Sequence, residues 1–284
     1  MNDISLTERN VTRINKLKED KWIGYTQATL ILEKLEDLMF HPKVHRMPNM
    51  VILGETNNGK TSVIKRFLKR HPAINDSFED ATQVPVVSIE MPPEANQDSI
   101  YISILRELYV PFQRNARKDE KFNQIKSIVE RLNIRMLMID EFHTLLDNNV
   151  LRQTQVLNTI KYLGNSLQIP IVAAGTKEAH RALLSDSQLS NRFKPYELSR
   201  WKLDIEFRKL LKSFEKLIDL DKPSNLDQRD LAIEIMNMSE GWIGEIAEII
   251  KSAAINAIKD GTEQITLDGL KKLHWITPTR RRQL

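Results

Sequence analysis

The sequence predicts a three-layer α/β domain built on a parallel five-stranded sheet, followed by a small α-helical domain. Four short apolar runs of strand length, at residues 50–53, 85–89, 134–139 and 169–174, alternate with stretches whose apolar residues recur at helical spacing. Parallel strands need crossover connections, and crossover helices cover both faces of such a sheet. After residue 201 the strand-like runs stop and only helical patterns remain.

Composition agrees with an ordinary globular protein and excludes several other classes. Of the 284 residues, 41% are hydrophobic and 28% are charged, with only 9 Gly and 11 Pro, which excludes collagen-like and wholly disordered chains. No apolar run approaches the ~20 residues that a membrane-spanning helix needs, and the N-terminus lacks an apolar signal segment. We therefore expect no membrane contact and a cytoplasmic protein. The absence of Cys excludes disulfides and thiolate zinc sites.

The first 49 residues predict a helical N-terminal extension. Leu30, Ile31, Leu35 and Leu38 form one apolar face, and the proline at 42 ends the pattern. We expect the α/β core at residues 50–200 and a helical domain at 201–273, followed by a basic tail at 274–284. The assignment of residues 201–273 rests on the apolar positions of two predicted helices: Ile205, Leu210, Phe214, Leu217, Ile243, Ile246, Ile250, Ala253 and Ala257.

A phosphate-binding loop follows the first apolar strand. Residues 54–61 read Gly-Glu-Thr-Asn-Asn-Gly-Lys-Thr, a G-x-x-x-x-G-K-T pattern placed between a strand and an amphipathic helix, as a P-loop requires. The backbone N–H groups of the loop would wrap the phosphates of ATP, and the helix N-terminus would add positive charge. Lys60 would contact the β- and γ-phosphates, and the Thr61 hydroxyl would bind Mg²⁺. The predicted nucleotide-binding set is Gly54, Glu55, Thr56, Asn57, Asn58, Gly59, Lys60, Thr61 and Ser62.

The apolar strand at 134–139 ends in two adjacent carboxylates, which is a Walker B pattern. Asp140 is predicted to hold Mg²⁺, whereas Glu141 is predicted to orient and polarise the attacking water. Alone, an apolar run followed by Asp-Glu also fits a solvated acidic turn. The P-loop eighty residues earlier makes the catalytic interpretation the stronger one.

Two further residues are candidates for contact with the γ-phosphate. In P-loop ATPases of the additional-strand class, one further strand is inserted between the two motif strands, and a polar residue at its end contacts the γ-phosphate. The strand at 169–174 would take that place here, so Thr176 at its end is a candidate sensor. The alternative is that Thr176 only caps the next helix. Arg192, in the segment Asn191-Arg192-Phe193 before an expected fifth strand near 196–198, is a candidate arginine finger for a neighbouring subunit. Its alternative is an ordinary surface charge.

These motifs together resemble those of AAA+ ATPases, and the chain more closely resembles the TniB family, whose members are transposition ATPases related to the TnsC group. The similarity rests on the P-loop and on the following segments in this order: Asp20–Tyr25, Arg46–Asn49, Ala173–Ala179, Ser190–Phe193 and Gly241–Glu245. It extends across most of the chain. The resemblance implies that residues 1–49 lead into the nucleotide site, that residues 50–200 form the AAA+ ATPase core, and that residues 201–273 form its helical lid.

The resemblance implies an AAA+ regulator of DNA transposition in the bacterial cytoplasm, associated with the nucleoid when on DNA. Such a protein binds ATP and Mg²⁺, assembles as a ring or helical filament on double-stranded DNA without sequence preference, and recruits a DDE transposase, together with a target-selection adaptor. Ile23 and Gly24 would lie near the adenine. AAA+ lids often carry a sensor arginine where this chain has Gly244-Glu245, so turnover is expected to be slow or assembly-dependent.

Related ATPases line a central DNA path with the region before Walker B. On that basis Arg114, Arg117, Lys118 and Lys121 would contact phosphates and give salt-sensitive binding. A solvated helix start is the alternative. Arg280, Arg281 and Arg282 in the tail would contact DNA or a partner, or would only add solubility.

Two other functions stay open at this point. One is a helicase-loader or initiator-type switch that remodels a protein partner, and the other is a monomeric kinase or NTPase that needs no arginine finger.

Overall fold

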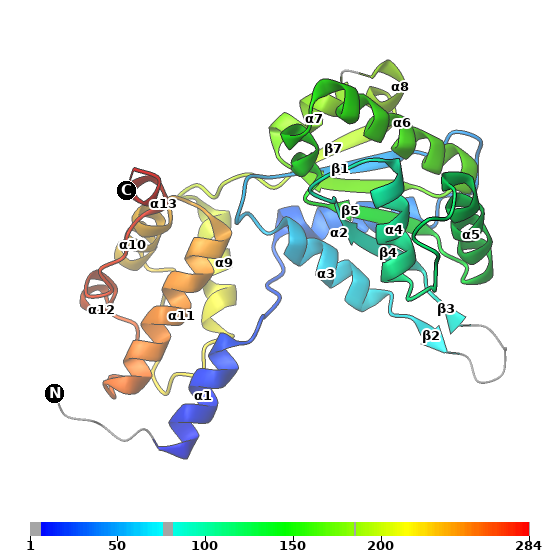
Figure 1. Ribbon diagram of the computed structural model, residues 1–284. Coiled ribbons are helices and arrows are strands. Elements are labelled where there is room, and N and C mark those ends of the chain that lie inside the picture. The colour runs from blue at the N-terminus through cyan, green and yellow to red at the C-terminus, as the bar shows by residue number, and fades with distance from the viewer. Residues whose placement is uncertain (1–6, 76–81, 185, 284) are drawn as a thin grey trace. The chain divides into compact units, whose positions relative to one another are not determined.

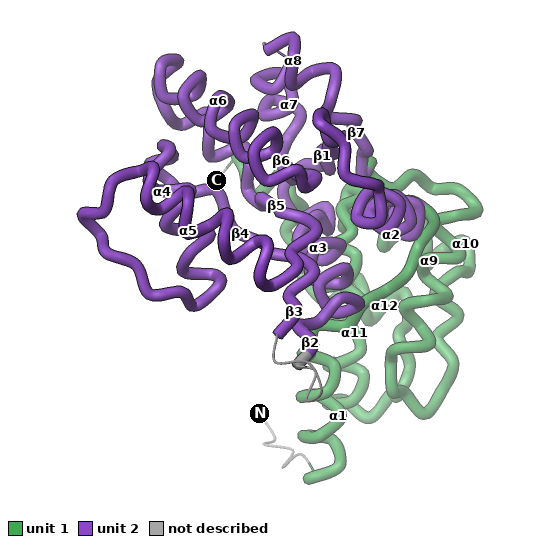
Figure 2. The backbone as a smooth tube through the Cα atoms, turned by 90° about the vertical axis from the view of Figure 1, so that its right-hand side faces the viewer, with its two compact units in different colours: residues 1–26, 199–284 green, residues 27–198 purple. Residues whose placement is uncertain are grey.

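The computed structural model describes residues 7–75, 82–184 and 186–283, so residues 1–6 of the predicted extension and residue 284 of the predicted tail lie outside it. The chain forms two compact units (Figure 2), an α/β unit of residues 27–198 and a helical unit that combines residues 1–26 with 199–284. The boundaries differ from the predicted segments, because the first helix packs with the C-terminal helices. The chain passes between the units twice, after residue 26 and after residue 198.

The α/β unit alternates strands with helices. Its elements are α2 (Thr26–Met39), β1 (Asn49–Leu53), α3 (Lys60–Arg70), β2 (Ile74–Asn75), β3 (Thr82–Gln83), β4 (Val86–Glu90), α4 (Gln97–Glu107), α5 (Lys118–Arg131), β5 (Met136–Asp140), the 3₁₀ helix η1 (Phe142–Asp147), α6 (Val150–Leu167), β6 (Ile171–Gly175), α7 (Lys177–Leu184), α8 (Ser187–Ser190) and β7 (Phe193–Glu197).

The central sheet has the strand order β4-β5-β6-β1-β7, and every neighbouring pair is parallel (Figure 1). The predicted five-stranded parallel sheet is therefore confirmed. Strand β6 lies between β1 and β5, since Ala173 is in register with both Val51 and Ile139. The carboxyl ends of β1, β5 and β6 consequently meet at one edge of the sheet.

Helices cover both faces of this sheet (Figure 1). On one face, alternate strand residues such as Val51, Ile139 and Ala173 form a single apolar cluster with side chains of α4, α5, α6 and α7. The intervening residues, such as Ile52, point to the opposite face because side chains alternate along a strand. Helices α2 and α3 supply the buried side chains of that layer, among them Ile31, Leu32, Leu35, Val63, Ile64 and Phe67.

Some local expectations differ from the structure. The apolar face of α2 uses Leu32, while Leu30 is 48% exposed, and Ile205 in the helical unit is 72% exposed. Helix α4 was not predicted, although Asn96 and Ser99 form a capping box at its start. Strands β2 and β3 form a short antiparallel pair, which the sequence did not predict either.

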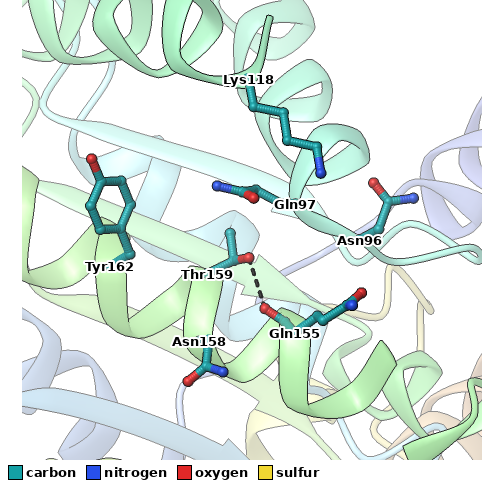
Figure 3. Close-up of a pocket in the computed structure, with 7 residues that line it drawn as sticks. All are labelled: Asn96, Gln97, Lys118, Gln155, Asn158, Thr159 and Tyr162. Atoms are coloured by element: carbon teal, nitrogen blue, oxygen red, sulfur yellow. Dashed lines mark hydrogen bonds between the residues drawn. The ribbon is translucent and has the colours of Figure 1, made fainter. Parts of the chain in front are cut away.

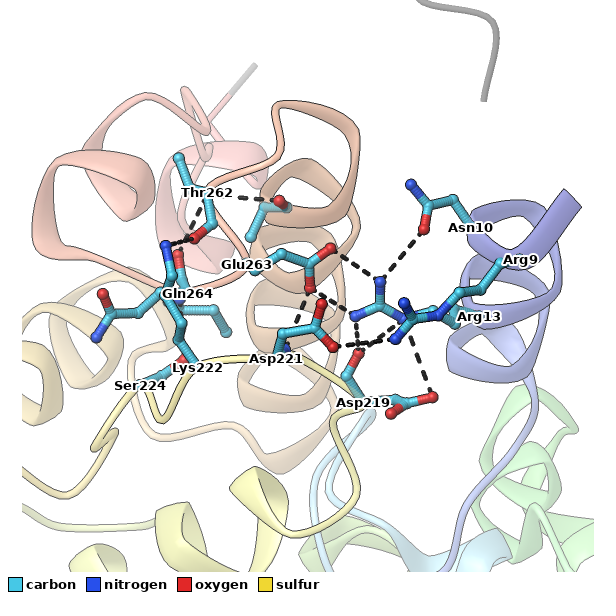
Figure 4. A network of polar contacts seen from close by, with 12 residues as sticks. Arg9, Asn10, Arg13, Asp219, Asp221, Lys222, Ser224, Thr262, Glu263 and Gln264 are labelled. Carbon is cyan, nitrogen blue, oxygen red and sulfur yellow. Dashed lines mark hydrogen bonds and ion pairs between the residues drawn. The ribbon is translucent and has the colours of Figure 1, made fainter. Parts of the chain in front are cut away.

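The helical unit consists of α1 (Glu8–Lys18), α9 (Ile205–Glu215), α10 (Arg229–Ser239), α11 (Ile243–Lys259), α12 (Leu267–Lys271) and α13 (Pro278–Arg281). Ile14 and Leu17 of α1 join its apolar core. Arg13, 5% exposed, donates to both carboxylate oxygens of Glu263 at 2.8 and 2.6 Å (Figure 4). This pair lowers the pKa of Glu263, chiefly through the Arg13 hydrogen bond, and fixes α1 to the unit.

Two features shape the end of the helical unit. Gly241 has a φ of +76°, and a Cβ there would lie 2.4 Å from the Trp201 carbonyl oxygen, so only glycine fits at this turn. The predicted tail is partly folded: Thr279 donates to Glu240, and Arg281 pairs with Glu245. Within the described residues, no helix is both long and apolar enough to span a bilayer.

Candidate functional site

The loop between β1 and α3 has the backbone of a phosphate-binding loop. Asn57 and Gly59 adopt left-handed conformations, with φ of 64° and 86°, and the Gly54 N–H donates to the Gly175 carbonyl at 3.1 Å. This bond holds the start of the loop against β6. The remaining predicted nucleotide-binding positions are exposed on the loop and the first turn of α3: Glu55, Thr56, Asn57, Thr61 and Ser62.

Lys60 spans this loop from the start of α3. Its ammonium donates to the carbonyl oxygens of Gly54 at 2.8 Å and Glu55 at 3.0 Å, and its side chain is 5% exposed. Burial lowers the pKa of Lys60, while the charges of Glu141 and Asp140 oppose that shift. Phosphate groups in the loop would relieve the desolvation of this buried cation.

Asp140 at the end of β5 connects the two motifs. The Thr61 hydroxyl donates to Asp140 Oδ2 at 2.7 Å, and the Glu141 N–H donates to Oδ1 at 2.8 Å. Mg²⁺ prefers such oxygen ligands and usually completes its shell with phosphates and water. The pair therefore fits Mg²⁺ bound together with a nucleotide. No group of three or more His, Cys, Asp and Glu residues in the described chain could hold a metal alone.

Glu141, the residue after Asp140, has a left-handed backbone with φ 52° and ψ 35°. Its carboxylate lies 3.3 Å from His143 Nε2, and the other ring nitrogen of His143 is buried without a hydrogen-bond partner. Because Glu141 is partly exposed beside the Lys60 loop, it can accept a proton from water at this edge. The histidine restricts the position of that carboxylate.

Thr176 follows β6, the strand between β1 and β5. Its carbonyl accepts from the His180 N–H in the first turn of α7, and its side chain hydrogen-bonds to Glu178. That contact, after the Glu178 backbone N–H, lowers the pKa of the Glu178 carboxyl. Both interpretations of Thr176, the helix cap and the sensor, stay predictions for a residue at the carboxyl edge of the sheet.

Arg192 lies at the opposite edge of the sheet. Its carbonyl accepts from the Asn49 N–H at the start of β1, whereas the P-loop follows the end of that five-residue strand. At about 3.3 Å per residue, the strand separates the two by roughly 16 Å. The guanidinium donates to Asn165 of α6 at 2.7 Å. Arg192 and the P-loop of the same chain therefore lie at opposite edges of the sheet.

Ile23 and Gly24 belong to the helical unit. Ile23 packs against its apolar core, and the neighbouring Tyr25 ring lies 5.3 Å from the Trp201 ring. Burial raises the pKa of Tyr25 to about 12. The predicted contact of Ile23 and Gly24 with adenine stays a prediction.

The candidate DNA-binding residues have different surroundings. Lys118 lines a polar pocket of about 340 Å³ formed by three helices (Figure 3), and the other lining residues are Asn96, Gln97, Gln155, Asn158, Thr159 and Tyr162. Arg114 is exposed, and Arg117 is exposed beside Glu120, at 3.1 Å. The prediction for Lys121 is wrong, because its ammonium is buried and pairs with Asp98 at 2.6 Å.

The sequence also missed a contact of the P-loop. The buried Asn58 side chain donates to the carbonyl of Leu198, the last residue of the α/β unit, and the Leu198 N–H donates to Leu53 at 2.7 Å. A Cβ on Gly54 would lie 3.4 Å from Leu198 Cβ. The loop thus holds the residue from which the chain leaves the unit. Asn58 was expected only as a nucleotide contact, and no local pattern indicated this distant partner.

Comparison with known proteins adds a family and a fold. The model of the family described as "Bacterial TniB protein" matches residues 13–203. No curated protein matches the chain.

Several solved structures share the fold. The Aeropyrum pernix ORC2 protein, in ADPNP and ADP complexes, superposes with a TM-score of 0.67 at 17% identity, over 91% of this chain and 70% of that one. The Aeropyrum pernix ORC1 protein in complex with DNA gives 0.61 at 13% identity, over 92% and 68%. A Thermotoga maritima RuvB variant gives 0.54 at 16% identity, over 90% and 72%. The α/β unit and the helical unit therefore have the architecture of an AAA+ ATPase.

Proposed function

We propose, from the premise that the chain belongs to the TniB family, that it is an ATP-dependent regulator of DNA transposition. In this proposal it binds ATP and Mg²⁺, assembles on double-stranded DNA, and recruits or activates a DDE transposase. ATP controls assembly and hydrolysis controls release. Strand transfer itself belongs to the partner.

One observation carries this proposal: the nucleotide residues and Arg192 lie at opposite edges of the same sheet. Lys60, Thr61 and Asp140 gather at the carboxyl edge, while Arg192 lies at the amino edge beside Asn49. A complete hydrolytic site then needs Arg192 of a second copy. The guanidinium of that arginine finger would supply positive charge at the γ-phosphate, which no arginine of the same chain's site supplies. ATP turnover is therefore proposed to depend on assembly, as a nucleotide-gated platform requires.

Within one site the residues divide the work. Lys60 would neutralise the phosphates, Glu141 would take a proton from the attacking water, and Thr176 would contact the γ-phosphate. Thr61 and Asp140 would hold Mg²⁺, which when bound neutralises charge that develops on the phosphoryl oxygens. The Arg192 fork from the next copy would stabilise the same oxygens.

Contact with DNA is proposed for the start of α5. Lys118 extends a cation beside the amide side chains of the polar pocket (Figure 3), and Arg114 and Arg117 are exposed nearby in sequence. A cation next to neutral donors suits phosphates and sugars, and such contacts bind without reading bases. Binding should accordingly weaken with salt.

The test is sedimentation of the protein with long duplex DNA, without nucleotide, with ADP, and with a non-hydrolysable ATP analogue. Large assemblies that form only with the analogue are expected. Lys60→Ala should abolish them, whereas Lys65→Ala, an exposed lysine on the same helix, should not. DNA-bound assemblies that form equally well with and without nucleotide would contradict the proposal.

The second candidate is an initiator-type switch that remodels a protein partner, and the fold that the chain shares with the ORC2 protein is compatible with it. It predicts ATP-dependent association with a protein and no assembly on DNA in any nucleotide state.

A further inference from the structure

A cavity of about 410 Å³ opens at the amino edge of the sheet, away from the P-loop. Arg46, Arg192 and Lys194 line it together with the polar side chains of Gln188 and Asn191. The described residues that line the cavity include three cations and no carboxylate. Such a concentration of positive charge selects an anion with several negative charges close together.

The cavity is held by buried structure. Met47, next to Arg46, is 2% exposed. Asn49 is 4% exposed, and its side chain accepts from the Ile171 N–H at 2.9 Å, at the start of β6. The segment Arg46–Asn49, which the P-loop function does not explain, thus anchors Arg46 at the edge of the sheet.

Two of the cations come from the region where the edge strand begins. Arg192 directly precedes β7 and Lys194 is its second residue, and both line the cavity. The Arg192 guanidinium is oriented by Asn165, with 2.7 Å between Nη1 and Oδ1. A planar fork in a fixed orientation suits phosphate oxygens.

We propose that this cavity receives the polyphosphate chain of a nucleotide bound to a second copy of the protein, and that Arg46 and Lys194 contact it together with Arg192. The chain's own nucleotide cannot reach the cavity, since a whole strand separates the two. This inference rests on the proposed function, because it requires assembly. Compared with the proposed function, it adds Arg46 and Lys194 to Arg192 as residues that contact the nucleotide of the second copy.

A phosphoanion could also come from DNA, and the geometry favours the nucleotide. A triphosphate concentrates its charge in one place, as the three cations of one cavity do. Duplex DNA spreads its phosphates along the helix axis and is met by rows of exposed cations.

The first experiment compares ATP turnover of Arg46→Ala and Lys194→Ala with that of the wild-type protein. Each change should lower turnover about tenfold, the loss expected for a charge-assisted hydrogen bond, and leave ATP affinity unchanged. Lys194→Arg should retain most of the activity because it keeps the charge. Lys43→Ala, three residues before Arg46 and also exposed, should behave as wild type.

The second experiment mixes Arg46→Ala with Glu141→Gln subunits. The Glu141→Gln copies bring an intact cavity to the ATP site of their Arg46→Ala neighbours, so turnover should recover in the mixture although each variant alone is slow. No recovery would overturn the proposal, because Arg46 would then act within its own chain. Loss of DNA affinity with normal turnover would also overturn it and assign the cavity to DNA.

The controls separate this inference from the proposed function. If Arg192→Ala hydrolyses ATP normally or the wild-type protein does not assemble, the proposed function itself fails. If Arg192→Ala is inactive while Arg46→Ala and Lys194→Ala are normal, only the enlarged anion site is refuted.

Discussion

Thr61 at the start of α3 donates a hydrogen bond to Asp140 at the end of β5, with 2.7 Å between the two oxygens. The two residues are separated by 79 positions in the sequence, and each comes from one of the two nucleotide motifs. The fold therefore places a hydroxyl and a carboxylate side by side, as two oxygen ligands of one Mg²⁺ would be.

Glu141→Gln should bind ATP with unchanged affinity and lower its turnover by about 10² or more, because the amide cannot accept the proton. The variant should also stay on DNA longer. Turnover in the assembled state and DNA release rates check this. Glu90→Gln at the end of the neighbouring strand β4 is the matched control, since Glu90 is an exposed carboxylate in register with Asp140. Rapid hydrolysis by Glu141→Gln would remove Glu141 from the mechanism.

Asn165→Ala should lower turnover about tenfold without changing ATP affinity, because Arg192 loses the acceptor that orients it. Asn165→Asp should be slower still, since a carboxylate would hold the guanidinium by an ion pair within its own subunit. Separate values of kcat and KM distinguish lost orientation, which lowers kcat, from lost binding, which raises KM. An Asn165→Ala protein with wild-type kcat would show that the hydrogen bond has no role in turnover.

Lys118→Ala and Lys121→Ala should affect different properties, DNA binding and stability, although the residues are only three positions apart. Lys118→Ala should weaken DNA binding and reduce the salt dependence by about 0.9 in the log–log slope, with unchanged stability. Lys121→Ala should lower the free energy of unfolding by on the order of 1–3 kcal/mol, because Asp98 loses a buried partner. Equal salt slopes for wild type and Lys118→Ala would contradict this assignment.

Gly241→Ala should destabilise the helical unit far more than Gly261→Ala. Both glycines have a positive φ, +76° and +74°, so both variants carry the strain of a left-handed alanine, about 1–2 kcal/mol. Only at Gly241 would the new Cβ meet a backbone atom, the Trp201 carbonyl oxygen at 2.4 Å. Urea unfolding followed by tryptophan fluorescence measures the difference, and equal midpoints would refute the steric argument.

Glu263→Gln should destabilise the protein at neutral pH and matter less in acid. The folded-state pKa of Glu263 lies below its usual 4.5 because of Arg13, so its stabilising contribution is complete above that value. The contribution is lost as the pH falls through the lowered folded-state pKa. The difference in unfolding free energy between wild type and variant should therefore shrink below pH 4.5, and a constant difference would exclude the ion pair as its cause.

The central sheet could be predicted from the sequence because its signals are local. Each strand is a short apolar run, and the glycines of the P-loop mark a turn whose backbone conformation few other residue types can adopt. Lys60, Asp140 and Glu141 came from the same local patterns. In the structure they gather at one edge, since β6 brings β1 and β5 close together.

The errors concern partners that are distant in the sequence. Lys121 looked like one more exposed lysine, and only the fold shows that Asp98 pairs with it 23 residues away. Leu30 continued the apolar stripe of α2 by spacing alone, although the packed face turned out to use Leu32. Asn58 and Asn165 were invisible as structural residues, because an amide gives no sign of which distant carbonyl or guanidinium it will meet.

The division of the helical unit between the two ends of the chain has a consequence for synthesis on the ribosome. Arg13 and Glu263 are 250 residues apart, so at 5–20 residues per second Arg13 waits roughly 12–50 seconds for its partner. The α/β unit, which lies between them in sequence, can fold during that time. Ile14 and Leu17 of α1 meanwhile lack the C-terminal helices against which they pack in the native unit.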